Sequence, residues 1–549
     1  MRVLVVGAGP SGLVAAKTLG EAGWTARVVE ASDRVGGTFA NKTYDDGRLV
    51  SSKFITAFSD ARLGGDVADH PSIEAYLAYL EEYCERFGLR DKIRFDTVVE
   101  EVGAREVDTG EYVVRLRLDD GRRVVERYDA VCVCSGLHNV PSMPEIPGLD
   151  KFEGETKHSS QYKDKSEFAG KRVLVVGSGE TGLDLVFRAI QVTPDVVLAT
   201  RSGFLSVPYV IADGLPLDTF ITNLCECSHL HPLLERFKIK WKFTTPFIRL
   251  AFMLGTGSSV GYNQWAGGKR PEEVQRGHLI INKSTDAMPF INRAAKRKSW
   301  LGRKVFSFLD DGPIYREFAD REITTKRGIK RFVPNSKLVE FDDGSQVAFD
   351  LVVFATGYQV SFPFISQDQH KQSLPNEHNI VRTGEPTLAF IGFVRPNVGA
   401  IPPMSEMQVM WWIQRLRGAI DGPTAPPTYR LLGKNERTGA YGVDYGAYMH
   451  DLARDIGAAP TLRGFASTRA LVAWALGQAY VPFFRLQGPF ADPDALRIAE
   501  TELFDPVARR PWASNALFVF LIGLFSVFNV LATIASPVVA LVDRFMTSL

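Results

Sequence analysis

Cysteine is scarce in this sequence, and neither sign of charge is in clear excess. Five cysteines in 549 residues are too few and too locally grouped for a disulfide framework, so we expect a reducing compartment. The formal net charge of +1 excludes the strongly basic domain typical of a dedicated nucleic-acid-binding protein. The lack of low-complexity tracts excludes long disordered regions, and the chain length predicts roughly three or four domain-sized units.

The carboxyl end differs from the rest of the chain. Residues 516–542 contain no charged side chain and are rich in Leu, Val, Phe and Ile. A helix of this length can span a hydrocarbon core of roughly 30 Å, so we predict a membrane anchor at 514–543. A buried core helix or an amphipathic surface helix is the alternative, and apolarity on all faces favours spanning. Arg509 and Arg510 precede the segment and Arg544 follows it, which predicts a catalytic body on the cytoplasmic side.

A strand at residues 2–6, a glycine turn and a helix at 13–19 follow one another at the amino end. In such a unit the first glycine allows a tight turn, the second lets the backbone approach a pyrophosphate, and the third lets helix pack on strand. A second strand ends at Glu30, where a carboxylate can accept hydrogen bonds from an adenosine ribose. The predicted nucleotide contacts are Gly7, Ala8, Gly9, Pro10, Ser11, Gly12 and Glu30.

Paired glycines come soon after this acid, followed by a threonine and an aromatic residue. An ordinary glycine turn would have the same residues, because glycine allows close approach of any backbone. The position just beyond the ribose acid favours continued contact with a long cofactor such as FAD. We therefore add Gly37, Thr38 and Phe39 to the predicted FAD contacts.

A second unit repeats the pattern, with a strand at 171–176, a glycine turn, a helix from 183 and a strand at 196–200. The last strand ends at Arg201, where the first unit has Glu30. An arginine suits a 2′-phosphate, so NADPH is preferred over NADH, although a surface arginine is the alternative. The predicted contacts are Gly177, Gly179, Thr181, Gly182, Asp184 and Arg201.

Two further segments, 129–136 and 350–358, are apolar strands that each end in a small residue and a glycine. They mark places where the chain leaves one sheet. The predicted fold is α/β, with two Rossmann-like dinucleotide-binding domains and a carboxyl-terminal transmembrane helix. The FAD domain takes residues 1–150 and 330–510, and the NADPH domain takes 151–329, with an insertion at about 205–320.

Between the two units, residues 152–162 match the pattern FxGxxxHxxxY, which ends at Tyr162. This stretch resembles the flavin-containing monooxygenases, whereas Baeyer–Villiger monooxygenases have tryptophan in place of Tyr162. The resemblance implies an FAD-dependent NADPH monooxygenase of the N,N-dimethylaniline monooxygenase type. In such an enzyme, O2 and the reduced flavin form a C4a-hydroperoxide that oxygenates a small amine or sulfide. For a eukaryotic chain it also implies the endoplasmic reticulum. An acid or base is one interpretation of His158, but a single histidine in a linker is more often a packing or hydrogen-bonding residue, so we predict a structural, cofactor-positioning role for it.

The sequence departs from this family at two positions. Val50 stands where mammalian members have an asparagine near the flavin, and Phe39 replaces a tryptophan. The resemblance places Val50 and Ser51 at the cofactor, with Ser51 or Ser52 as the substitute hydrogen-bond donor. A peroxide-producing NADPH oxidase or a Baeyer–Villiger enzyme is therefore an alternative, and a non-catalytic, membrane-tethered dinucleotide-binding protein is another.

Two clusters have a less specific pattern. Cys225, Cys227, His229 and His231 alternate with other residues, which is not a usual zinc spacing, so we predict no metal site. The basic run at 293–304 is typical of a solvated face, with contact to anionic lipid as the alternative.

Overall fold

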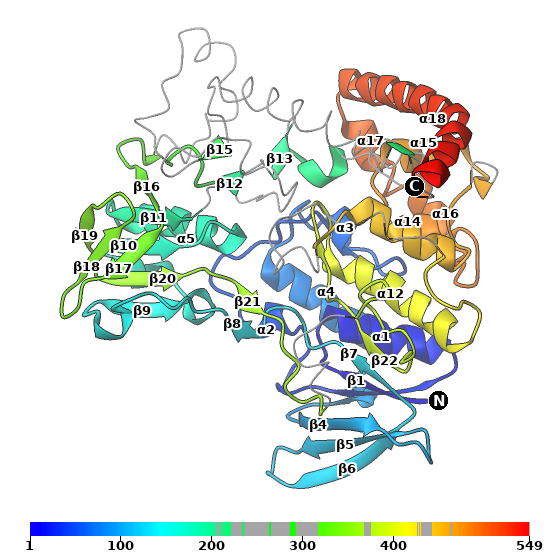
Figure 1. The fold of residues 1–549 in the computed structure, drawn as a ribbon, viewed down its shortest axis with the longest axis horizontal. Helices are drawn as coiled ribbons and strands as arrows, with labels where there is room; N and C mark the ends of the chain where they lie inside the picture. Colours follow the sequence, from blue (N-terminus) through cyan, green and yellow to red (C-terminus); the bar gives the residue numbers. More distant parts are fainter. Residues whose placement is uncertain are drawn as a thin grey trace.

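The computed structural model describes residues 1–201, 317–366, 375–424, 442–461 and 464–547, with short pieces at 204–205, 209–211, 214–220, 233–234, 263–264 and 286–291 and residues 427 and 429. Most of the expected insertion at 205–320 lies outside the described residues. Two five-stranded sheets form the centres of two units (Figure 1).

The first sheet has the strand order β22-β7-β1-β2-β3 and is parallel throughout. Its apolar strands are buried on both faces, as expected for a parallel sheet covered by helices. Its strands and the helix that follows β1 are β1 (Arg2–Val6), α1 (Pro10–Glu21), β2 (Thr25–Val29), β3 (Ile93–Arg94), β7 (Ala130–Val133) and β22 (Leu388–Phe390).

The second sheet has the order β16-β11-β10-β20-β9 and is also parallel. Its elements are β9 (Glu155–His158), β10 (Val173–Val176), α5 (Glu180–Val192), β11 (Val196–Thr200), β16 (Ile323–Arg327) and β20 (Leu351–Phe354). Because β20 pairs with β10, the chain returns to the first sheet after Phe354. This is later than residue 330, where the sequence placed the return.

Smaller antiparallel sheets flank each unit. A three-stranded sheet beside the first contains β4 (Val98–Arg105), β5 (Tyr112–Arg117) and β6 (Arg123–Tyr128), and one beside the second contains β17 (Ile329–Phe332), β18 (Leu338–Phe341) and β19 (Gln346–Ala348). Two-stranded pairs join β8 (Val140–Pro141) to β21 (Tyr358–Gln359), β12 (Phe204–Leu205) to β15 (Asn263–Gln264), β13 (Val210–Ile211) to β14 (Leu215–Pro216), and β23 (Arg395–Pro396) to β24 (Gly442–Val443).

Helices from distant parts of the chain complete the first unit. They are α2 (Thr38–Asn41), α3 (Lys53–Thr56), α4 (Ile73–Arg86), α12 (Ile401–Leu416), α14 (Tyr445–Asp455), α15 (Thr468–Leu476), α16 (Ala495–Glu500) and α17 (Asp505–Arg509). Helix α12 packs along α1 and buries Trp411 and Trp412 completely. One hydrophobic core therefore contains β1, α1, α4, α12 and α14, and the second sheet has a core of its own.

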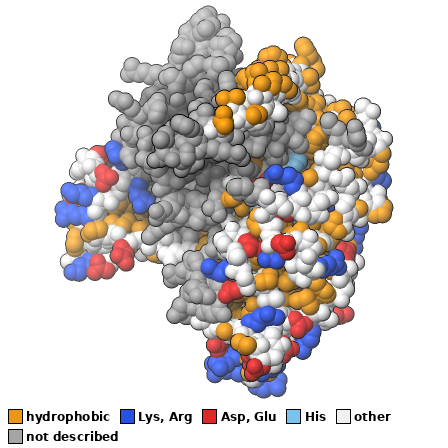
Figure 2. All heavy atoms as spheres, turned by 45° about the vertical axis from the view of Figure 1, so that its right-hand side comes forward, with side chains coloured by type: hydrophobic (Ala, Val, Ile, Leu, Met, Phe, Trp, Pro, Cys, Tyr) orange, Lys and Arg blue, Asp and Glu red, His pale blue; other side chains and the backbone are white. Residues whose placement is uncertain are grey.

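The last helix, α18 (Trp512–Thr547), lies at the edge of the molecule, in red in Figure 1. Its apolar side chains face outward: Phe520, Ile534 and Leu541 are 64%, 69% and 70% exposed. Figure 2 shows hydrophobic side chains gathered at the same upper end of the molecule. Residues Trp512–Val539 have the length and composition to cross a membrane. The helix thus covers the predicted anchor at 514–543.

Candidate functional site

The first glycine turn connects β1 to α1 and leaves no room for side chains. Gly7 has φ +104°, and its N–H donates to the carbonyl of Val29 at 2.8 Å. A Cβ at Gly12 would lie 1.8 Å from the oxygen of Gly7. Only glycine at residue 12 therefore lets α1 begin this close to β1, so that the first backbone N–H groups of the helix are free for an anion.

Glu30 follows β2 directly, and its carboxylate lies at this turn. One oxygen accepts the N–H of Ala8 at 2.7 Å, and the other accepts the N–H and hydroxyl of Ser32 at 2.9 and 2.8 Å. The residue is 8% exposed. Its position at the carboxyl end of the strand is where a ribose would lie. Sequence reasoning missed Ser32, which a hydroxyl two residues after the acid could have suggested.

The paired glycines pack against the same turn. The N–H of Gly36 donates to the carbonyl of Ala8 at 3.0 Å, and a Cβ at Gly37 would lie 3.1 Å from the Cα of Gly9. Thr38 then begins α2, and the ring of Phe39 lies edge-on to a tyrosine of α4. The structure therefore places Gly36 and Gly37 against the first turn, and Thr38 and Phe39 follow them at the start of α2.

Pro10 is the first residue of α1, and Ser11 follows it at the contact between α1 and α12. The hydroxyl of Ser11 lies 2.8 Å from that of Ser405, and a Cβ at Gly392 would collide with Ser11. The contact joins residues almost 400 positions apart, so no local pattern could have identified it.

The second glycine turn repeats the first almost contact for contact. Gly177 has φ +111° and donates to the carbonyl of Ala199 at 2.9 Å, and a Cβ at Gly182 would lie 2.0 Å from the oxygen of Gly177. A Cβ at Gly177 would meet the carbonyl oxygen of Ala355 at 2.4 Å. The segment after β20 thus closes over this turn, as the segment after β7 closes over the first.

The region around the second turn is open, with Glu180 at the start of α5 and Arg201 after β11. A Cβ at Gly179 would meet nothing within 4 Å, and Thr181 is half-buried in the first turn of α5. Arg201 follows β11 directly and is exposed. The guanidinium is therefore accessible to a phosphate at the carboxyl end of this strand.

Asp184 belongs to a contact between the two units. Its carboxylate accepts the hydroxyl of Tyr44 at 2.6 Å and Nε of Arg188 at 3.1 Å. Arg188 also reaches Asp45 at 3.2 Å, and Tyr162 lies with its ring 5.4 Å from that of Tyr44. The last residue of the FxGxxxHxxxY stretch therefore supports the contact between the units.

His158 holds the strand that crosses between the units. Its Nε2 lies 3.1 Å from the carbonyl of Gly357, and its Nδ1 lies 2.9 Å from the hydroxyl of Ser160. Burial lowers the pKa of His158, which keeps the ring neutral near pH 7. These contacts suit the positioning role that its place in the linker predicts.

Val50 and Ser51 precede the short helix α3. Val50 is 38% exposed, and the hydroxyl of Ser51 lies 2.8 Å from that of Thr56. The backbone N–H of Ser52 donates to the carboxylate of Asp218 at 2.7 Å. Sequence reasoning missed Asp218, because it lies in the insertion, where no motif points to it.

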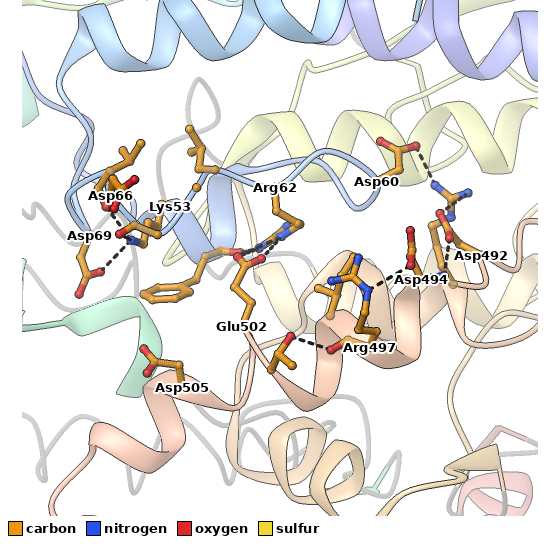
Figure 3. Close-up of a pocket in the computed structure, with 18 of the residues that line it drawn as sticks. Lys53, Asp60, Arg62, Asp66, Asp69, Asp492, Asp494, Arg497, Glu502 and Asp505 are labelled. Atoms are coloured by element: carbon orange, nitrogen blue, oxygen red, sulfur yellow. Dashed lines mark hydrogen bonds and ion pairs between the residues drawn. The ribbon is translucent and has the colours of Figure 1, made fainter. Parts of the chain in front are cut away.

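A polar cleft of about 1200 Å³ lies beside this segment, between residues 53–69 and the carboxyl-terminal helices (Figure 3). Arg62 pairs with Glu502 at 2.8 Å across it, and Lys53 lies 3.6 Å from Asp69. Neither glycine turn contributes to its lining. The cleft is a charged junction between two parts of the chain, apart from the nucleotide sites.

The Cys225 to His231 cluster and the basic run at 293–304 lie outside the described residues. Among the described residues, no group of three or more His, Cys, Asp and Glu side chains could hold a metal ion.

A family model described as flavin-binding monooxygenase-like matches residues 1–246 and 296–538. The chain belongs to this family. Monooxygenase PC-14 of Penicillium crustosum is 35% identical, with 97% of this chain and 98% of the relative covered. Flavin-containing monooxygenase 1 of Rattus norvegicus is 28% identical, with 89% of each covered. The solved S-allyl-L-cysteine S-oxygenase of Allium sativum shares the fold at a TM-score of 0.57 and 19% identity, covering 92% of this chain and 98% of that one.

Membership confirms the resemblance of residues 152–162 to flavin monooxygenases and makes FAD and NADPH the cofactors of this chain. The residues fit two dinucleotides. In each turn the first and third glycines lie where a Cβ would collide with backbone, and each turn lies at a helix amino terminus. A buried acid follows one parallel strand, and an exposed arginine follows its counterpart.

Proposed function

We propose that this flavin monooxygenase binds FAD at the first turn and NADPH at the second, and oxygenates a soft nitrogen or sulfur nucleophile. The observation that carries the assignment is the opposite charge at two matching positions. Glu30 follows β2 and Arg201 follows β11, beside turns with the same contacts. A carboxylate accepts ribose hydroxyls and repels a 2′-phosphate, whereas a guanidinium binds it.

FAD supplies the chemistry when bound, because its reduced form passes electrons from NADPH to oxygen. The chain orients the cofactors. Tyr44 and Asp184 fix one unit against the other, and His158 holds the crossing strand. The other residues of this assignment are Gly7, Ala8, Gly9, Pro10, Ser11, Gly12, Gly37, Thr38, Phe39, Val50 and Ser51 for FAD, and Gly177, Gly179, Thr181 and Gly182 for NADPH.

The choice of nucleophile rests on two supports. Tyr162 ends the FxGxxxHxxxY stretch as in the amine- and sulfide-oxidising branch. The Allium sativum enzyme with the same fold is described as an S-oxygenase. A soft nucleophile needs no activation by a protein base, which suits a site whose histidine is buried, neutral and bound to backbone.

A peroxide-producing NADPH oxidase is a second candidate, because of Val50. Valine offers no hydrogen-bond donor, and the hydroxyl of the neighbouring Ser51 lies against Thr56. Peroxide held near a flavin without a donor is lost more readily.

One experiment separates the two. The FAD-loaded full-length enzyme is given NADPH and oxygen, with thioanisole or N,N-dimethylaniline as the probe. Oxygenation predicts sulfoxide or N-oxide in proportion to NADPH consumed. Peroxide formed in step with NADPH oxidation, unchanged by either probe, would establish the oxidase instead.

We also propose that α18 anchors the protein in a bilayer, with the catalytic body on the cytoplasmic side and, in a eukaryotic cell, at the endoplasmic reticulum. The exposed apolar surface of α18 supports this, since such a surface is costly in water. Arg509 and Arg510 before the helix favour that orientation.

A further inference from the structure

The hydrogen bond from Ser52 to Asp218 joins two residues 166 positions apart. Both are fully buried, at 0% and 2% exposure. A buried carboxylate requires hydrogen-bond donors to compensate for the loss of water. The backbone N–H of Ser52 is such a donor, so the position of Ser52 and that of the carboxylate depend on each other.

Asp218 is itself held in place by the helical turn η5 (Leu217–Phe220). Arg510, two residues before α18, donates to the carbonyl of Thr219 and lies over the ring of Phe220 at 5.2 Å. The same guanidinium lies 4.9 Å from the ring of Phe518 in α18. These contacts fix the turn to the start of the last helix, so the backbone that carries Asp218 is held in place.

The chain after Ser52 is fixed on its other side. Arg62 binds Glu502 at 2.8 Å, and Asp69 binds Arg509 at 2.8 Å (Figure 3 shows the Arg62 pair). Residues 53–69 are thus held by the carboxyl-terminal helices. Val50 and Ser51 are held less strongly: the Ser51 hydroxyl lies 2.8 Å from that of Thr56, and Leu49 before them donates its N–H to the carbonyl of Pro71 at 2.9 Å. The bond from Ser52 to Asp218 is the support of this segment that comes from the other unit.

We propose that Asp218 is a positioning residue, whose carboxylate holds the Ser52 amide and so fixes Val50 and Ser51 against the flavin. This role rests on the proposed function, which places residues 50 and 51 at FAD. The productive reaction converts substrate, O2, NADPH and H⁺ to oxygenated substrate, NADP⁺ and H2O. The wasteful one converts O2, NADPH and H⁺ to H2O2 and NADP⁺. A loosened segment admits water and favours the wasteful reaction.

The test compares Asp218→Ala with Asp218→Asn in the full-length, FAD-loaded enzyme, with thioanisole as the probe. Asparagine keeps an oxygen that can accept the Ser52 N–H, whereas alanine removes it. We expect Asp218→Ala to raise the peroxide formed per NADPH by about fivefold, the factor for one ordinary hydrogen bond. Asp218→Asn stays near the wild-type ratio, and FAD content is unchanged in both. Asp108→Ala, at an exposed hairpin position, is the control.

Equal peroxide ratios for wild type and Asp218→Ala would overturn the proposal. An equal rise in the peroxide ratio in Asp218→Ala and Asp218→Asn would also overturn it, because the negative charge of the carboxylate, and not its hydrogen-bond acceptor, would then matter. If the wild type itself releases all electrons as peroxide, the proposed function fails, and hydrogen exchange of residues 48–56 decides the positioning role. Faster exchange in Asp218→Ala alone supports it, and unchanged exchange rejects it.

Discussion

The phenol of Tyr44 donates a hydrogen bond to the carboxylate of Asp184 at 2.6 Å and so ties the first unit of the fold to helix α5 of the second. Burial raises the pKa of Tyr44 far above its usual value, so the hydroxyl remains a donor at any physiological pH. Arg188 lies over the same ring at 4.8 Å. Two nucleotides bound on different units can exchange a hydride only if this junction keeps them aligned.

Tyr44→Phe is therefore expected to slow flavin reduction by NADPH and to leave FAD content unchanged. A hydrogen bond to a charged group contributes about 1.5–3 kcal/mol. Even partial loss of alignment should therefore make flavin reduction by NADPH about tenfold slower. Anaerobic stopped-flow absorbance measures the rate. Tyr112→Phe removes a hydroxyl that contacts Thr387 beside the first sheet, and it should leave the rate unchanged. Equal rates for wild type and Tyr44→Phe would show that the junction does not control reduction.

Gly12→Ala is expected to impair FAD binding alone, and Gly182→Ala is expected to impair NADPH binding alone. Each new Cβ would collide with a backbone oxygen, at 1.8 Å from that of Gly7 and 2.0 Å from that of Gly177. Gly12→Ala should purify without flavin. Gly182→Ala should keep FAD, measured by its absorbance, and lose reduction by NADPH. Gly64→Ala, where a Cβ meets nothing within 4 Å, is the control. Loss of flavin from Gly182→Ala alone would reverse the assignment of the turns.

The local elements of this fold were readable from the sequence. The strand predicted at 2–6 is β1, and the one predicted at 196–200 is β11, because apolar runs before glycine turns depend on neighbouring residues alone. The contacts of Ser11 with Ser405 and of Ser52 with Asp218 could not be predicted, since they join residues far apart in the chain. The return of the chain after Phe354 was misplaced for a similar reason: the pairing of β20 with β10 is nonlocal.

Arg201→Ala is expected to weaken the binding of NADPH far more than that of NADH. A guanidinium on a phosphate makes charge-assisted hydrogen bonds, and losing them corresponds to about 10- to 100-fold in affinity. The ratio of kcat/KM for NADPH to that for NADH measures this and should fall by about that factor. Arg122→Ala, on the exposed hairpin between β5 and β6, should not change it. A parallel loss for both nucleotides would mean that Arg201 does not contact the 2′-phosphate.

A buried ion network stabilises the first unit, and Arg485→Met is expected to destabilise the folded protein. Glu406 is 1% exposed and lies 3.5 Å from Arg485, which also binds Asp60 at 3.0 Å. Removing the cation leaves two buried carboxylates with Lys17 and Ser59 as their partners, which together supply one positive charge, at a cost of up to about 3–5 kcal/mol. Thermal unfolding should show a clear drop, whereas Arg497→Met, an exposed pair with Asp494, should show little.

The same variant should change how stability depends on pH. Burial already raises the pKa of Glu406, so the folded state binds its proton more tightly than the unfolded state does. Stability from this group is therefore present at low pH and declines as pH rises from its unfolded pKa through its raised folded pKa. Without Arg485 that pKa rises further, so the decline above the ordinary pKa of a glutamate should extend to higher pH. If the stability of Arg485→Met varies with pH in parallel with that of the wild type, the destabilisation does not come from Glu406.

Ending the chain after Phe520 is expected to abolish membrane binding while sparing catalysis. The shortened chain keeps Arg510 with its contacts to Asn515 and Phe518, so the clamp on the turn at 217–220 survives. It loses the outward-facing apolar residues from Leu521 onward, which supply most of the surface that a bilayer would cover. Flotation with phosphatidylcholine vesicles measures binding: the full chain should float at high salt, and the shortened chain should stay at the bottom. Flotation of the full chain at low salt alone would point to charged headgroup contact, and α18 would then be a surface helix, not an anchor.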